Sequence, residues 1–164
     1  MRADRVVALG AAVAAFAVLA GCGGGTGGAG ATVSARDLPG VGTVLVDRAG
    51  RTLYFADQET GGRIVCLAEC VSAWVPLTVA TGTIPTGGAE VTGSLAVVSR
   101  PDGGNQVTYD GRPLYTFAAD GGAGRAAGNG VRDKFGGTDL VWHAAAAAGS
   151  GSAAPGGGDN GFGY

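Results

Sequence analysis

Short apolar runs separated by glycine-containing turns form the main pattern in the middle of the chain. Val44–Asp47 and Thr52–Phe55 are rich in β-branched or aromatic residues and flank Arg48-Ala49-Gly50, which predicts a β-hairpin. A second hairpin is expected around Asp110-Gly111, because glycine tolerates the positive φ that a type I′ turn requires. This part of the chain is therefore predicted to be rich in β-strands.

A further strand and one helix complete the predicted elements. Ser94–Ser99 is another apolar run, and the turn residues 100–104 that follow it predict a three-stranded meander over residues 94–118. The one plausible helix is Leu67–Trp74, which we expect Pro76 to stop, because proline is incompatible with a helix interior. The predicted fold class is mainly β: a small two-copy β-hairpin and meander domain with one short helix, flanked by disordered Gly-rich segments.

Part of the pattern occurs twice. Gly50-Arg51-Thr52-Leu53-Tyr54 recurs 61 positions later as Gly111-Arg112-Pro113-Leu114-Tyr115, and four of the five residues are identical. In both copies an aromatic residue, an aspartate and then a tryptophan follow in the same order. This ordered series predicts two related halves, at about residues 41–80 and 94–143.

The N-terminal residues have the three parts of a secretory signal peptide. A positively charged start is followed by the uncharged apolar run Val6–Ala20 and then by small residues. An uncleaved membrane anchor is the alternative, but a spanning helix needs about 20 apolar residues and this run has only 15. Leu19-Ala20-Gly21-Cys22 resembles the lipobox of bacterial prolipoproteins, so we expect residues 1–21 to be removed and Cys22 to be lipidated.

Charge and composition narrow the range of partners. The full chain has 11 Lys and Arg residues against 13 Asp and Glu, and loss of Arg2, Asp4 and Arg5 with the leader leaves a formal charge of −3. Nucleic-acid binding requires a basic stripe, so we expect no nucleic-acid partner. The predicted membrane partner is held through the N-terminal lipid anchor, because acyl chains partition into the bilayer.

The full chain has 34 glycine residues, and many of them lie near its two ends. Segments of this composition lose much entropy on ordering and bury little apolar surface, so we expect them not to fold. On this basis residues 22–37 are predicted to be a lipidated tether, residues 38–145 the folded domain, and residues 146–164 a disordered tail.

Lipidation of Cys22 leaves Cys66 and Cys70, which we expect to form a disulfide in an oxidising compartment. Residues four apart in a regular helix have Cβ atoms about 5–6 Å apart, whereas a disulfide needs about 3.8 Å. The chain around Cys66 should therefore be irregular, with any helix starting nearer Ala68. The alternative is a redox dithiol, but such sites use Cys-x-x-Cys at a helix start, and here three residues intervene.

Tyr115-Thr116-Phe117-Ala118-Ala119-Asp120 fits the motif Y-x-[FWY]-x-x-D, and the chain resembles the secreted-repeat family of predicted bacterial lipoproteins, whose function is unknown. The resemblance covers residues 41–143 and includes Arg100-Pro101-Asp102-Gly103. Two departures stand out. The first copy, Tyr54-Phe55-Ala56-Asp57, is two residues shorter between tyrosine and aspartate, and Trp74-Val75-Pro76 stands where the family usually has Trp-Pro-Pro. The resemblance implies an extracytoplasmic lipoprotein with this fold, and it implies no particular activity.

The motif residues have two interpretations. Alternation along a strand puts Tyr115 and Phe117 on one face, and Asp120 is well placed to accept backbone N–H bonds in the next turn. This favours a core aromatic pair with a turn-capping acid. The functional alternative is a ligand-binding platform in which the aromatic rings stack and the acids bind a cation or a sugar hydroxyl. Its candidate residues are Tyr54, Asp57, Tyr115, Phe117 and Asp120.

His143 is the only histidine, so a metal site, a haem site or a hydrolytic base would each depend on it. The sequence has no ligand cluster at metal spacing and no nucleophile elbow, so we expect no catalytic residue, metal site or cofactor. We expect a non-enzymatic, membrane-anchored extracytoplasmic lipoprotein that binds a small-molecule or envelope-protein partner. The alternatives are an envelope redox or metal/haem accessory protein using Cys66/Cys70 or His143 and, more weakly, a hydrolase that requires His143.

Overall fold

The computed structural model describes residues 30–147, which contain eleven β-strands, one short α-helix and one 3-10 helix. The predicted mainly β class is confirmed. No helix within residues 30–147 has the length and apolar character needed to cross a membrane. The predicted signal peptide, the lipidation site Cys22 and residues 148–164 lie outside the described residues.

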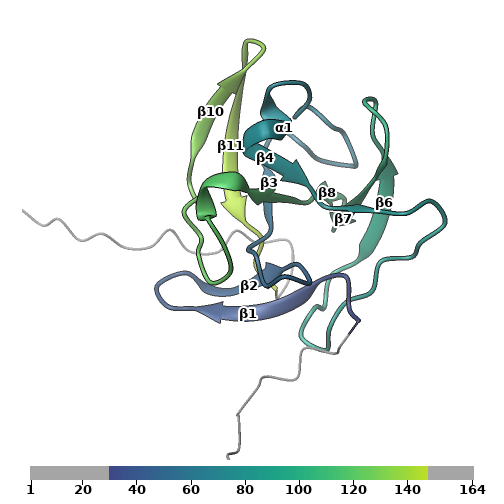
Figure 1. The fold of residues 1–164 in the computed structure, drawn as a ribbon, viewed down its shortest axis with the longest axis vertical. Helices are drawn as coiled ribbons and strands as arrows, with labels where there is room; N and C mark the ends of the chain where they lie inside the picture. The colour runs from purple at the N-terminus through teal and green to yellow at the C-terminus, as the bar shows by residue number, and fades with distance from the viewer. Residues whose placement is uncertain (1–29, 148–164) are drawn as a thin grey trace, which may run out of the picture.

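The strands form three antiparallel sheets (Figure 1). The smallest pairs β1 (Ser34–Leu38) with β2 (Gly42–Val46). The largest has the order β10 (Arg132–Phe135), β11 (Thr138–Ala144), β3 (Tyr54–Ala56), β9 (Tyr115–Phe117) and β4 (Trp74–Pro76). The third has the order β5 (Thr78–Val79), β7 (Asn105–Tyr109) and β6 (Leu95–Ser99), with β8 (Arg112–Pro113) also paired to β7. The helices are α1 (Cys70–Ala73) and the 3-10 helix η1 (Ala118–Asp120).

The two sequence copies lie side by side at the centre of the largest sheet. Tyr54 on β3 is paired with Tyr115 on β9. The outer neighbours are exchanged between the halves, because Trp142 of the second half pairs with Ala56 on β3. Correspondingly, Trp74 of the first half pairs with Phe117 on β9. Each half therefore completes the sheet of the other.

Two equivalent closed cycles of three backbone hydrogen bonds also link the halves. In each cycle, every residue donates its N–H to the next residue and accepts one from the previous residue, at 2.8–2.9 Å. One cycle joins Leu45 and Leu53 of the first half to Ala145, and the other joins Val107 and Leu114 of the second half to Leu77 of the first. Leu45 and Val107 are therefore counterparts, as are Leu53 and Leu114. The structure has internal twofold-like symmetry in its backbone pairing.

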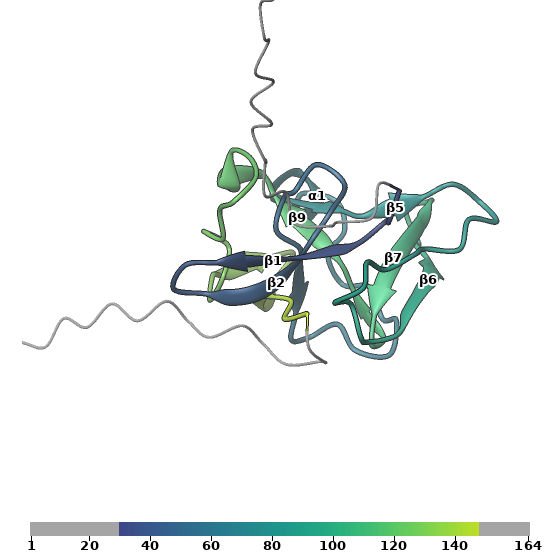
Figure 2. The same cartoon turned by 90° about the horizontal axis from the view of Figure 1, so that it is seen from below.

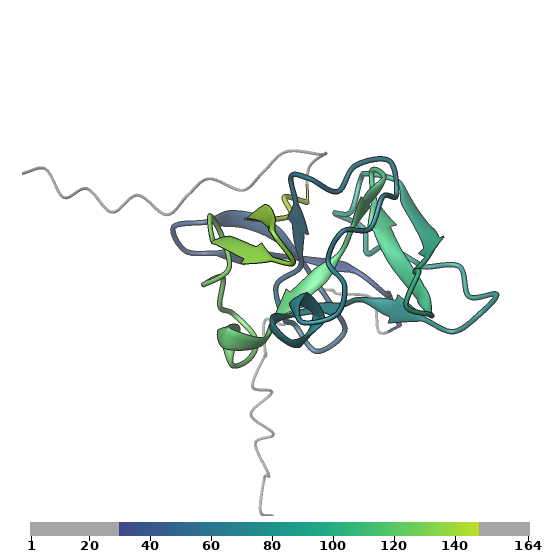
Figure 3. The ribbon, with the colours of Figure 1, turned by 90° about the horizontal axis from the view of Figure 1, so that it is seen from above.

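The alternation of side chains along β3 and β9 gives each copy two buried faces. Tyr54 and Tyr115 belong to one core cluster, in which the Trp74 and Trp142 rings are stacked with centroids 3.9 Å apart. The leucines that precede the tyrosines belong to a second cluster beneath the β6–β7 pair. The β6–β7 pair and the β10–β11 hairpin lie at opposite ends of the molecule, as Figures 2 and 3 show from two sides.

The predicted hairpin around Asp110-Gly111 is confirmed. Both residues have positive φ, 49° and 74°, as a type I′ turn requires. The turn joins β7 to β8 with Tyr109 paired to Arg112. The predicted meander is present as β6, β7 and β8, with β6 and β8 on opposite edges of β7. It ends at Pro113 and not at residue 118, because Tyr115–Phe117 form β9 of the largest sheet.

The predicted helix Leu67–Trp74 is wrong in length, because α1 contains only Cys70–Ala73. Ala68 has a φ of 52°, a left-handed conformation that an α-helix cannot include. At the other end the chain enters β4 at Trp74, before it reaches Pro76. The expected irregular backbone around Cys66 is confirmed.

The folded part of the chain extends beyond the predicted residues 38–145 at both ends. Val33 is fully buried and β1 begins at Ser34, so the predicted tether 22–37 ends before residue 32. At the other end Ala146 bridges to Val44, and Ala147 is buried. The fold extends further at the N-terminal end because β1 pairs with β2. Without β1, the main-chain N–H and C=O groups along one side of β2 would be an open edge.

Candidate functional site

The two motif tyrosines lie at the centre of the molecule. Tyr54 and Tyr115 are both fully buried. The Tyr54 hydroxyl donates to Asp120 Oδ2 at 2.7 Å, and the Tyr115 hydroxyl donates to Glu59 Oε1 at 3.1 Å. Each tyrosine therefore donates a hydrogen bond to a carboxylate in the other half, so the two bonds connect the halves.

Glu59 is the first-half counterpart of Asp120, from which it is separated by the same 61 positions as the two tyrosines. Glu59 Oε1 accepts the N–H of Cys66 at 2.7 Å. Asp120 Oδ1 accepts the N–H of Ala127, again 61 positions later than Cys66, at 2.8 Å. The interpretation of Asp57 as the first-copy acid is therefore corrected. Adding the repeat spacing to each acid in turn would have identified Glu59.

The electrostatics of the crossed pairs favour a structural role. Burial, together with the adjacent carboxylates, raises the pKa of Tyr54 and Tyr115 above the ordinary tyrosine value, so both hydroxyls keep their protons and donate. Burial also raises the pKa of Asp120, and this effect is opposed by the hydrogen bonds from Tyr54 and from backbone N–H groups. Phe117 stacks on Trp74 with ring centroids 4.2 Å apart. These residues do not form an exposed platform.

Asp57, by contrast, is half exposed at the surface. Its Oδ2 lies 2.9 Å from Nε2 of His143, and its Oδ1 lies 3.8 Å from Nη1 of Arg112. The Arg112 guanidinium stacks 4.4 Å from the centroid of the Phe55 ring. The Asp57 network therefore holds Arg112 over the ring face of a buried aromatic residue. This arrangement favours a structural role for His143, whose ring centroid lies 5.7 Å from that of Phe55.

The predicted disulfide between Cys66 and Cys70 is confirmed, and both cysteines are fully buried. Arg100, itself only 6% exposed, donates from Nη2 to the Cys66 carbonyl at 2.9 Å and from Nη1 to Gln106 Oε1 at 2.6 Å. Asp102 pairs with the same guanidinium at 2.6 Å. The Arg-Pro-Asp-Gly turn therefore holds the disulfide loop in place through Arg100. The sequence predicted only a turn here and not this contact.

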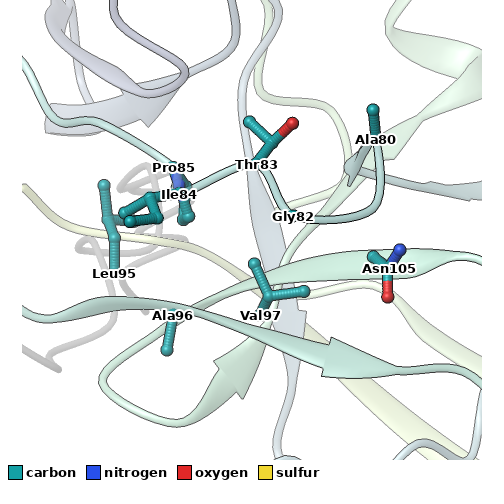
Figure 4. Close-up of a pocket in the computed structure, with 9 residues that line it drawn as sticks. All are labelled: Ala80, Gly82, Thr83, Ile84, Pro85, Leu95, Ala96, Val97 and Asn105. Atoms are coloured by element: carbon teal, nitrogen blue, oxygen red, sulfur yellow. The ribbon is translucent and has the colours of Figure 1, made fainter.

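An open cavity of about 380 Å³ lies between the loop of residues 80–85 and β6 (Figure 4). Leu95 and Val97 of β6 point toward this loop, whereas Ala96 points away from it. None of the lining residues is charged. Ile84, on the loop, is 83% exposed, although it is a large aliphatic residue. We call this cavity the β6 groove; sequence reasoning missed it because loop 80–85 carries no motif.

Within residues 30–147, no three His, Cys, Asp or Glu side chains gather where they could hold a metal ion. Cys66 and Cys70 are joined in a buried disulfide. The β6 groove fits a ligand site, since such sites are concave, mostly apolar and about 300–1,000 Å³ in volume.

Comparison with known proteins indicates the compartment in which the protein is found. Residues 96–146 match a family model described as a secreted repeat of unknown function. The match covers most of the second half, from β6 to the end of β11. Neither a curated protein nor a solved structure matches the chain. The family description indicates an extracytoplasmic protein.

Proposed function

We propose that this protein is a lipid-anchored, non-enzymatic module of the bacterial envelope that binds an uncharged, largely apolar ligand in the β6 groove. The observation that carries the proposal is the groove itself, which has an uncharged lining and a large exposed aliphatic side chain, Ile84, at its rim. Exposed apolar surface around a concavity is typical of binding sites. A charged ligand would lose hydration there without gaining an ionic partner.

The anchoring part of the proposal is supported by the N-terminal sequence. The apolar run ending in Leu19-Ala20-Gly21-Cys22 supports cleavage before Cys22 and acylation of its thiol. The secreted description of the matched family is consistent with export. A lipid at Cys22 would hold the protein at a membrane as its partner, and the chain's mildly acidic charge gives no reason to expect nucleic acid as another.

The redox and hydrolytic alternatives receive less support from the described residues. A redox dithiol needs an accessible, activated thiolate, whereas Cys66 and Cys70 are buried and bonded to each other. A metal or haem site at His143, or a hydrolase built on it, would have to recruit a side chain whose ring nitrogen is 2.9 Å from Asp57. We therefore propose no cofactor and no catalytic residue.

The experiment is a fluorescence titration of the full chain with Nile red, a neutral dye whose emission rises in apolar surroundings. Ile84→Asp should weaken dye binding at least tenfold, because it places a charge at the rim of the groove. Val75→Asp is the matched control, since Val75 is also an exposed aliphatic residue, at 42%, but does not line the groove. Equal binding by the wild type and Ile84→Asp would refute the groove as the site.

A further inference from the structure

We infer that the ligand of the β6 groove is an extended, uncharged polypeptide segment of a partner, which adds as an extra strand to the free edge of β6. The inference rests on the proposed function and names the chemical class of its ligand. Four observations support it: the register of β6, the absence of charge on this strand, the use of the corresponding edge in the first half, and the position of the groove.

The first observation is the direction of the main-chain groups on β6. Within residues 30–147, β6 pairs only with β7, at one end of the sheet order β5-β7-β6. The Ser94 carbonyl accepts the Asp110 N–H at 2.9 Å, and the Arg100 N–H donates to Gly104 at 3.0 Å. Alternate residues of an antiparallel strand point their main-chain groups at the partner strand. Those of the odd-numbered residues Leu95, Val97 and Ser99 therefore point to the free edge.

The second observation is that β6 lacks the features that usually protect an edge strand. Proteins blunt exposed edges with charged residues, proline or bulges, because unpaired N–H and C=O groups attract further strands. The corresponding strand of the first half, β1, carries Arg36 and Asp37. The sequence of β6, Leu-Ala-Val-Val-Ser, has no charge and no proline, and Val97 at its centre is 39% exposed.

The third observation is that the first half already holds a backbone segment at the corresponding edge. Val33 lies two residues before Ala35, which is paired with Leu45. Leu95 likewise lies two residues before Val97, which is paired with Val107. Because Leu45 and Val107 are counterparts, Val33 and Leu95 are counterparts too.

At Val33 this edge is occupied. The Val33 N–H donates to the Thr86 carbonyl at 3.1 Å, and its carbonyl accepts the Gly88 N–H at 2.9 Å. Val33 and Gly87 form a parallel bridge. The fold therefore accepts an added strand at this position in one half, whereas within residues 30–147 no strand bridges to β6 on that side in the other half.

The fourth observation is the position of the β6 groove. Leu95 and Val97 point into it (Figure 4). In an added strand, every second side chain would lie on this same face, next to Val97 and close to Ile84. The lining has no charge to pair with a charged side chain. The bound segment should therefore carry uncharged apolar residues at alternate positions, while main-chain hydrogen bonds supply affinity, as in other cases of strand addition.

The test selects heptapeptides from a displayed random library on the full chain and resynthesises the best binder. A single N-methyl group is then placed on each of its amides in turn. Methylation of alternate amides should weaken binding at least tenfold, and methylation of the intervening amides should change it less than threefold. Val97→Pro should also abolish binding, because it removes an outward N–H that β7 does not use, while Val97→Thr should preserve it.

The inference is overturned if no peptide is enriched, if the enriched peptides are charged, or if N-methylation has no alternating effect. It is also overturned if light scattering shows a dimer of the full chain that Val97→Pro dissociates, since the occupant would then be a second copy. The N-methyl series uses the wild-type protein, so it stands even if Val97→Pro fails to fold. If Nile red binding depends on Ile84 but peptides do not bind, only this inference fails; if dye binding is independent of Ile84, the proposed function fails.

Discussion

The crossed tyrosine–carboxylate pairs lead to a test of how the two halves are joined. Tyr54→Phe removes the hydroxyl donor of Asp120 Oδ2, a bond of 2.7 Å to a buried carboxylate. A hydrogen bond to a charged group contributes about 1.5–3 kcal/mol, so we expect the free energy of unfolding to fall by about that amount. Tyr115→Phe should cost less, about 0.5–1.5 kcal/mol, because its bond is longer, 3.1 Å, and Glu59 Oε1 keeps two backbone N–H donors.

The assay is urea unfolding at neutral pH, followed by tryptophan fluorescence and combined in double-mutant cycles. The cycle of Tyr54→Phe with Asp120→Asn should give a coupling energy above about 1 kcal/mol, because these residues are in contact. The matched cycle of Tyr54→Phe with Glu59→Gln should give a coupling energy within about 0.5 kcal/mol of zero. Stronger coupling of Tyr54 to Glu59 than to Asp120 would refute the exchange of partners between the halves.

Three further predictions concern other parts of the chain. Gly128→Ala should destabilise the protein by about 1–3 kcal/mol in urea unfolding, because its Cβ would lie 2.8 Å from an aromatic ring atom, whereas Gly88→Ala, with only ordinary contacts, should be nearly neutral. The hydrogen bond from Arg100 lowers the pKa of Asp102, so the Asp102 carboxylate stabilises the fold above its ordinary pKa of about 3.9 and loses that effect as the pH falls through the lowered value. The difference in unfolding free energy between the wild type and Asp102→Asn should therefore shrink during acid titration. A difference that stays constant with pH would contradict this prediction. Cys22→Ser should abolish incorporation of labelled palmitate while leaving the unfolding midpoint unchanged, and a shifted midpoint would show that Cys22 has a role in the fold.

Local patterns were sufficient to predict the Asp110-Gly111 hairpin, the disulfide and the repeat. The Asp110-Gly111 turn follows from the ability of both residues to adopt positive φ, and the recurring Leu-Tyr pair marks the two central strands. The cysteine spacing, four positions, correctly predicted an irregular backbone near Cys66. These features depend on residues close together in the chain, which is why sequence alone reveals them.

Features that depend on distant residues could not be predicted in the same way. The partner of Tyr54 is Asp120 because the strands of the two halves interleave, and no local rule indicates this exchange. The Gly-rich composition after Cys22 predicts a tether as far as residue 37, yet pairing with β2 makes Ser34–Leu38 part of the fold. The length of α1 was missed because Ala68, a good helix former, adopts a left-handed conformation inside the disulfide loop.

The central functional claim is that the edge of β6 is open for a partner strand in the intact protein. Residue-resolved amide hydrogen exchange on the full chain tests this most directly. We predict an alternating pattern, in which the N–H groups of Ala96 and Val98, directed at β7, exchange slowly, and those of Leu95, Val97 and Ser99 exchange quickly. Uniformly slow exchange along the strand would show that the edge is already covered and would contradict the account.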